Sequence, residues 1–217
     1  MQVLNRARLF RWPVWCLFLS AAAMLGGCAT TLLPQPEVAT TRTYLLEWNG
    51  SLSGSPLQAG GPSLLISSMR AASGYESADM AYVRTPHQLE YFARHRWVDA
   101  PARMLEPLLL QAAGASGLFS TVSEAGSGTQ AQLRLDSRLL HLRQVCRLRP
   151  SELQLAVRLT LLDVASAKQI GSRVISVSEA INERTPAAGV AAANRALPAL
   201  MSQVADFLAE HVGDPGR

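Results

Sequence analysis

Cysteine is scarce in this sequence, with three residues in a chain of 217. Cys16 and Cys28 lie in, or just after, an apolar N-terminal stretch, so only Cys146 belongs to the body of the chain. A single remaining thiol excludes an intramolecular disulfide. Cys146 lies in a segment of alternating apolar residues, and we expect a small core residue there and not a nucleophile.

Catalytic and cofactor-binding motifs are also missing. The sequence has no Gly-x-Ser-x-Gly turn, phosphate-binding loop, dinucleotide fingerprint or His-Glu-x-x-His pair. The carboxylates are scattered, and the four histidines lie in separate segments without metal-ligand spacing: His87, His95, His141 and His211. We therefore expect no enzymatic activity, metal or cofactor. The alternative is a hydrolase whose catalytic residues meet only in the fold.

The body of the chain has little net charge. The whole chain carries +4 at pH 7, and the first 27 residues contain three arginines and no acid. Without those residues the net charge is +1. Bulk charge therefore gives no reason to expect nucleic-acid binding.

The N-terminus has the pattern of a bacterial lipoprotein signal peptide. Three arginines precede an apolar stretch from Trp12 to Leu25, which is shorter than the roughly 20 residues of a membrane-spanning helix. The stretch ends in Leu25-Gly26-Gly27-Cys28, which resembles a lipobox. We predict cleavage between Gly27 and Cys28, with diacylglycerol and palmitate-like acyl chains on the Cys28 sulfur and amine. The alternative is an ordinary secretory peptide with a cysteine there by chance.

Lipid on Cys28 would be the anchor, because no second apolar segment of membrane length follows it. The next residue is Ala29. In the common sorting logic of two-membrane bacteria, Asp at that position retains a lipoprotein on the inner membrane. We therefore expect the periplasmic face of the outer membrane.

The rest of the chain divides into a tether and one domain. Residues 28–42 contain two prolines and no hydrophobic periodicity, which predicts a lipidated, extended tether. Residues 43–213 are long enough for a single domain with its own core. Apolar alternation predicts strands over Thr43–Trp48, Ser63–Met69, Met80–Arg84, Gln88–Arg96, Leu118–Ser123, Ala131–Leu148, Leu153–Leu161 and Gln169–Glu179. A Gly/Ser/Pro-rich loop is expected at 49–62, and a phase shift near Leu140 predicts a bulge.

Two helices are expected from apolar residues at helical spacing. The first begins at an Asp99 cap and Pro101 and ends at Gly114 and Gly117. The second begins at a Thr185 cap with Pro186 in its first position. Internal prolines should kink the helices, at Pro107 and Pro198. We predict an α+β fold: an antiparallel sheet with both helices packed on one face, in two similar strand-then-helix halves.

Two groups of side chains have a functional interpretation beside a structural one. An arginine series on the long predicted hairpin forms a candidate docking surface for an acidic partner or anionic lipid head groups: Arg134, Arg138, Arg143, Arg147, Arg149 and Arg158. Its alternative is a solvated strand face. An aromatic group is a candidate lining for a lipid-accepting groove: Tyr82, Tyr91, Phe92 and Trp97. Its alternative is core packing.

The sequence resembles the ABC-type transport auxiliary lipoprotein family over nearly all of the body of the chain. The residues that carry the resemblance follow the lipobox: Tyr82-Val83-Arg84, Pro86-His87-Gln88-Leu89, Trp97, Pro101, Leu105 and Leu108. The alanine-rich C-terminal helix also fits. The prolines within the helices and the loop at 50–62 depart from the pattern.

The resemblance implies an anchored accessory with no catalysis of its own. It would work beside an ABC permease and ATPase and an MCE-domain protein, which move phospholipids or other apolar molecules between membranes. The family motif would have a structural role, carried by Tyr82, Arg84, Trp97, Pro101 and Leu105. The alternative is a structural or assembly lipoprotein of the outer membrane. A homo-oligomer is compatible with both.

Overall fold

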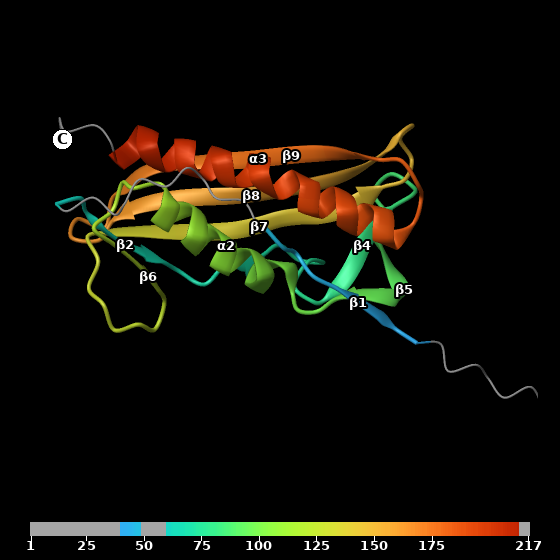
Figure 1. The fold of residues 1–217 in the computed structure, drawn as a ribbon, viewed down its shortest axis with the longest axis horizontal. Helices are drawn as coiled ribbons and strands as arrows, with labels where there is room; N and C mark the ends of the chain where they lie inside the picture. Colours follow the sequence, from blue (N-terminus) through green and yellow to red (C-terminus); the bar gives the residue numbers. More distant parts are fainter. Residues whose placement is uncertain (1–39, 49–59, 213–217) are drawn as a thin grey trace, which may run out of the picture. The chain divides into compact units, whose positions relative to one another are not determined.

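The computed structural model describes residues 40–48 and 60–212. The predicted signal peptide, the lipidation site Cys28, residues 29–39 of the tether and residues 49–59 of the predicted loop lie outside the described residues. The described chain forms a large sheet with two helices (Figure 1). The predicted α+β class is therefore confirmed.

Strands followed by a helix occur twice along the chain. The first run is β1 (Arg42–Tyr44), β2 (Ser63–Ile66), β3 (Arg70–Ala71), β4 (Asp79–Val83), β5 (Glu90–Trp97) and helix α2 (Pro101–Ala115). The second run is β6 (Thr121–Glu124), β7 (Leu133–Val145), β8 (Ser151–Asp163), β9 (Gln169–Ile181) and helix α3 (Pro186–Val212). Apart from the short strand β3, which was not predicted, the element order matches the prediction, but strands of both runs share one sheet.

The sheet is mixed, so the prediction of a purely antiparallel sheet was wrong. Strands β7, β8 and β9 form an antiparallel meander, and β4 and β5 form an antiparallel hairpin. The other edge of β7 pairs in parallel with β2, β3 and β4 in turn. Strand β6 pairs in parallel with β2, and β1 with β5. The long strand β7 therefore organises the three short strands that precede α2.

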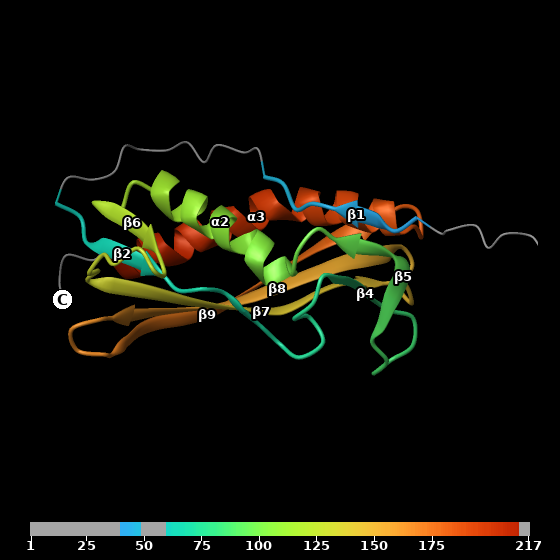
Figure 2. The ribbon, with the colours of Figure 1, turned by 90° about the horizontal axis from the view of Figure 1, so that it is seen from below.

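Both helices lie on the same face of the sheet, as predicted (Figure 2). Alternate residues of β8, from Leu153 to Leu161, are buried beneath them. In β7 the buried phase runs through Leu139 and resumes at Leu142. The pairing of β7 with β8 shifts between Leu139 and His141, which confirms the predicted bulge. The bulge keeps the apolar side chains of both ends of β7 on the helix side.

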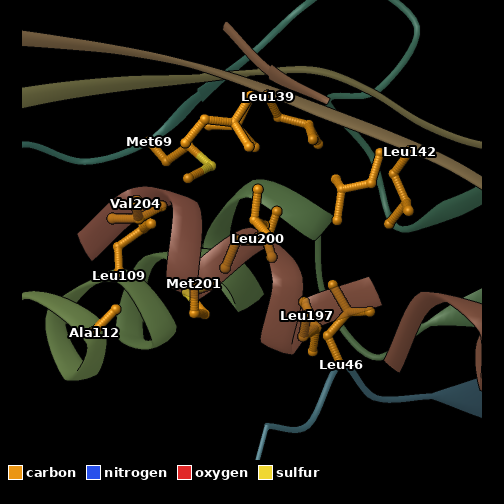
Figure 3. Packing of buried hydrophobic residues seen from close by; sticks show 14 of the residues in the cluster. Leu46, Met69, Leu109, Ala112, Leu139, Leu142, Leu197, Leu200, Met201 and Val204 are labelled. Atoms are coloured by element: carbon orange, nitrogen blue, oxygen red, sulfur yellow. The ribbon is translucent and has the colours of Figure 1, made fainter. Parts of the chain in front are cut away.

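The core fills the layer between the helices and the sheet (Figure 3). Leu200 and Val204 of α3 are fully buried, as is Leu109 of α2, and Leu139 of β7 lies above them from the sheet. Full burial of each such side chain stabilises the folded state by roughly 1.5–3 kcal/mol relative to leaving it exposed. The two apolar helix stripes read from the sequence are therefore the surfaces that cover the sheet.

The helix ends only partly follow the prediction. The Thr185 hydroxyl accepts a 3.1 Å hydrogen bond from the Ala188 amide, which confirms the cap of α3. The residue that caps α2 is Ala100 and not Asp99, because the Asp99 carboxylate turns to the Ala100 amide and pairs with Arg103. Gly114 lies inside α2 and does not end it. Both helices continue through their prolines, which are exposed: Pro107 and Pro198.

The segment after β1 leaves the sheet, so the strand predicted over Thr43–Trp48 ends at Tyr44. The Asn194 side chain of α3 explains the change. Its amide oxygen accepts from the Glu47 amide at 2.8 Å, and its amide nitrogen donates to the Leu45 carbonyl at 3.2 Å. A helix side chain thus satisfies backbone groups that would otherwise seek a strand partner.

A close approach between α3 and β7 gives the first prediction. The buried Gln144 side chain lies against Gly189, where an added Cβ would be 1.8 Å from its Nε2 atom. Gly189→Ala should therefore lower the free energy of unfolding by about 1–3 kcal/mol, because overpacking outweighs the better helix propensity of alanine. Chemical denaturation measures the change. The double variant Gly189→Ala/Gln144→Ala should recover most of the loss; equal instability of the single and double variants would contradict this origin.

Candidate docking surface

The face of the sheet away from the helices is open among the described residues (Figure 2). It is formed by the residues of β7, β8 and β9 that alternate with the buried ones. On β9 these residues are small or apolar and mostly exposed: Ile170, Ser172, Val174, Ser176, Ser178 and Ala180. The charged residues of this face therefore come from the strands nearer β7.

Three arginines lie in register across this face. Arg70 of β3 pairs with Arg138 of β7, and Arg138 pairs with Arg158 of β8. We call these three residues the arginine row. Neighbouring strands are about 4.8 Å apart, so the side chains of directly opposed residues on one face are close neighbours. All three side chains are exposed.

The arginine row is electrostatically uncompensated. No side-chain hydrogen bond or ion pair within the described part of the chain involves Arg70, Arg138 or Arg158. Like charges directly opposite one another on a sheet destabilise it. The nearby carboxylate of Asp136 is already engaged, at 3.1 Å from Arg134 Nε and 2.7 Å from the Ser67 hydroxyl. The row is therefore a local positive patch on a nearly neutral domain.

The rest of the predicted arginine series does not join the row. Arg134 is compensated by Asp136, and Arg143 donates to the side-chain Oε1 atom of Gln154 at 3.2–3.3 Å. Arg147 and Arg149 lie in the turn after β7. Of the predicted arginine series, therefore, only Arg138 and Arg158 belong to the row. Arg70, which the sequence analysis did not single out, completes it through the parallel pairing of β3.

The aromatic group divides between core and surface. Trp97 is buried at the end of β5, and Tyr91 is exposed, with its hydroxyl donating to the Gly74 carbonyl at 2.9 Å. The rings of Tyr82 and Phe92 lie 4.4 Å apart and are half-buried. Tyr82 and Phe92 line one cavity and Trp97 lines a different one, so among the described residues the four rings do not share a single groove.

The family motif residues hold the β4–β5 hairpin and the start of α2. The Tyr82 hydroxyl donates to Glu90 at 3.0 Å, and Arg84 forms an ion pair with the same carboxylate. The hydrogen bond from Arg84 is the main reason that the pKa of Glu90 is lowered. Pro101 occupies the first turn of α2, and Leu105 is fully buried. These contacts fit the structural role that the resemblance implied.

The titratable side chains of the described residues are mostly dispersed or paired. No three His, Cys, Asp or Glu side chains within 40–48 and 60–212 are grouped to hold a metal ion. Burial raises the pKa of the half-buried Cys146 thiol, which disfavours the nucleophilic thiolate. A cavity of about 630 Å³ near the end of α3 has two carboxylates, but Glu210 pairs with Arg173 and Asp163 accepts from Ser166.

The helices that the structure describes are too short or too polar to cross a bilayer. Among the described residues, the arginine row is a group of directly opposed charges on the sheet without an internal partner.

Comparison with solved structures supports the fold. A crystal structure of a Xanthomonas campestris protein is similar with a TM-score of 0.69 and 18% identity, covering 77% of this chain and 94% of that one. An uncharacterized protein matches with a TM-score of 0.61 and 11% identity, covering 78% and 99%. A PelC dodecamer from Paraburkholderia phytofirmans reaches a TM-score of 0.42 at 15% identity, covering 68% and 91%. None of the curated proteins matches this chain.

The sequence itself matches one protein family over most of its length. Residues 44–205 fit the ABC-type transport auxiliary lipoprotein component. The match begins at the last residue of β1, spans β2 to β9 together with α2, and ends within α3. It also includes the family motif from Tyr82 to Leu105. This chain therefore belongs to the family of ABC-type transport auxiliary lipoprotein components.

Proposed function

We propose that this chain is a non-catalytic, lipid-anchored accessory of an envelope ABC transport system, and that it docks on an acidic surface of its partner through the arginine row. Membership of the auxiliary family supports the association with ABC transport. The lipobox before Cys28 supports the anchor. The engaged carboxylates and the protonated Cys146 thiol support a role without catalysis.

The arginine row is the observation that carries the docking proposal. Three opposed positive charges without a carboxylate disfavour the folded domain slightly. An acidic partner would remove that repulsion and would be attracted over about 8–10 Å at physiological salt. The row lies on a regular strand surface and thus presents its charges in a fixed order. Such an arrangement favours a protein surface that carries complementary acids.

The partner proteins, the cargo and the membrane are inferred from the sequence. The resemblance points to an MCE-domain protein together with the permease and ATPase, and to phospholipids or other apolar molecules as cargo. Ala29 after Cys28 favours the outer membrane, facing the periplasm. Residues 28–42, fully extended, would reach about 50 Å. That length would let the domain meet a partner that projects from the opposite membrane.

Charge reversal in the row tests the docking surface. The variant Arg138→Glu/Arg158→Glu should lose at least about tenfold in capture of the transport complex from membranes, because two attractive pairs become repulsive. The free energy of unfolding should change by about 0.5 kcal/mol or less per substitution, since both side chains are exposed. Raising the salt concentration should weaken capture by the wild type and leave the variant little affected.

A matched control separates the row from charge in general. Arg94→Glu/Arg147→Glu makes the same change of net charge at two exposed arginines that lie outside the row. This control should capture the complex as the wild type does. Equal loss in both double variants, or no loss in either, would overturn the row as the docking site. Specific capture of an outer-membrane protein in place of the transporter would favour the assembly-lipoprotein alternative.

A further inference from the structure

A cavity lies on the helix side of the sheet, between β4, β5, the end of β7 and the loop before α3. Its volume is about 390 Å³, and its lining is Tyr82, Arg84, Phe92, Cys146 and Arg184. Tyr82 pairs in register with Gln144, whose amide donates to a carbonyl at the start of α3. The cavity and the arginine row are therefore on opposite faces of the sheet.

One wall of the cavity is apolar. The Tyr82 and Phe92 rings pack against each other at 4.4 Å, and the half-buried Cys146 thiol lies beside them. Burial raises the pKa of this thiol, so it is protonated at neutral pH and behaves as a small apolar group. The wall therefore suits methylene groups and not a polar ligand.

The rim of the cavity carries one uncompensated positive charge. Arg84 lies over the Tyr82 ring at 5.3 Å and forms an ion pair with Glu90, so its charge is balanced. Arg184 is exposed and takes part in no hydrogen bond or ion pair within the described chain. A guanidinium next to an apolar wall matches a ligand that joins an acid to a hydrocarbon segment.

We propose that this cavity binds the acidic end of a single-chain amphiphile. Arg184 pairs with the carboxylate or phosphate, and Tyr82 and Phe92 contact the methylene groups next to it. The single free charge selects a monoanion. The volume lies at the low end for small-molecule sites, which suits a head and a short segment but not two acyl chains. This site is independent of the arginine row and would exist whether or not the chain docks on a transporter.

Cys146 reports occupancy of the cavity, because it lines the wall. The experiment uses the mature, lipidated protein in phosphatidylcholine vesicles, where Cys146 is the remaining free thiol. The alkylation rate of Cys146 by N-ethylmaleimide is measured against octanoate concentration. Octanoate should slow alkylation severalfold at saturation. Arg184→Gln should raise the octanoate concentration for half-protection about tenfold or more, as expected for loss of a charge-assisted hydrogen bond. Each variant is compared with its own rate without octanoate.

Three further probes define the ligand. Octanol has the same chain without the charge, and inorganic phosphate has the charge without the chain; neither should protect Cys146. Vesicles that contain phosphatidylglycerol distinguish the sources of the acid. Protection by these vesicles without octanoate would identify the head group of a two-chain membrane lipid and would overturn the single-chain ligand, whereas protection by octanoate alone would identify a free amphiphile. Equal protection by octanol and octanoate, or no protection by either anion source, would overturn the proposal.

Arg147→Gln is the matched control for Arg184→Gln. Both remove one exposed arginine near Cys146, but only Arg184 lines the cavity. Both variants should fold as the wild type, because neither side chain is buried. Octanoate should protect Arg147→Gln as well as the wild type. If both variants lose protection to the same extent, the effect is one of general charge and the cavity is not a specific site.

Discussion

Cys28→Ala should abolish lipid attachment completely and leave the chain as an unprocessed precursor. The sequence around this residue, Leu25-Gly26-Gly27-Cys28, has the spacing of a lipobox, and no other apolar segment of membrane length follows it. Acyl chains stabilise membrane association by about 0.8 kcal/mol per buried CH₂, so their loss removes the stable anchor.

Metabolic labelling with radioactive palmitate, followed by electrophoresis, measures this result. The wild type should be labelled and migrate as the shorter, processed form, whereas the variant should be unlabelled and migrate as the longer precursor. The matched control is Cys146→Ala, which removes a thiol from the folded domain and should be labelled normally. Palmitate on the Cys28→Ala variant would show that the anchor lies elsewhere.

Phe207→Ala should be among the most destabilising single changes in the folded domain. Phe207 is a fully buried residue of α3, and its ring centroid lies 4.6 Å from that of the His211 ring and 5.4 Å from the Arg173 guanidinium. Its removal opens a large cavity, and we expect a loss of about 3–5 kcal/mol in the free energy of unfolding. For a domain of this size that corresponds to a fall of roughly 10 °C in Tm.

Thermal unfolding of the full chain, followed by near-ultraviolet circular dichroism, measures the shift. Val174→Ala is the control, because it removes apolar atoms from the same strand as Arg173 but on the open face, where Val174 is 46% exposed. This control should change Tm by a degree or two at most. Similar shifts for the two variants would show that α3 contributes little to the core.

Elements with a long, regular pattern could be predicted from the sequence. The alternation from Leu153 to Leu161 identified both β8 and its buried face, and the phase slip near Leu140 identified the bulge in β7. In these strands the burial of one side is strong enough to fix the register. The apolar stripes of α2 and α3 were found for the same reason.

The pairing of the short strands could not be predicted. Strand β3 has two residues, Arg70 and Ala71, and its parallel alignment with β7 depends on the path of the whole first half. No local pattern distinguishes such a segment from a loop. The antiparallel expectation failed at these strands, and Arg70 was missed in the docking surface as a consequence.

The sequence also could not predict which arginines form an ion pair with a carboxylate. Arg134 and Arg138 are alike in the sequence, two residues from Asp136 on either side, yet only Arg134 pairs with it. The choice depends on side-chain geometry and on the Ser67 hydroxyl from the segment between β2 and β3. The residue that caps α2 differs from the predicted one for a similar reason, because the Asp99 carboxylate binds Arg103 and the Ala100 amide.

We propose that this lipoprotein is an accessory of an ABC transport system and docks on its partner through the arginine row of the sheet. The most direct test is affinity purification of the full-length, membrane-anchored chain from cross-linked membranes of its own cell, with co-purified proteins identified by mass spectrometry. We expect an ABC ATPase, its permease and an MCE-domain protein to co-purify with the wild type and with Arg94→Glu/Arg147→Glu, and to be strongly depleted with Arg138→Glu/Arg158→Glu. Absence of every transporter subunit from the wild-type sample would contradict it.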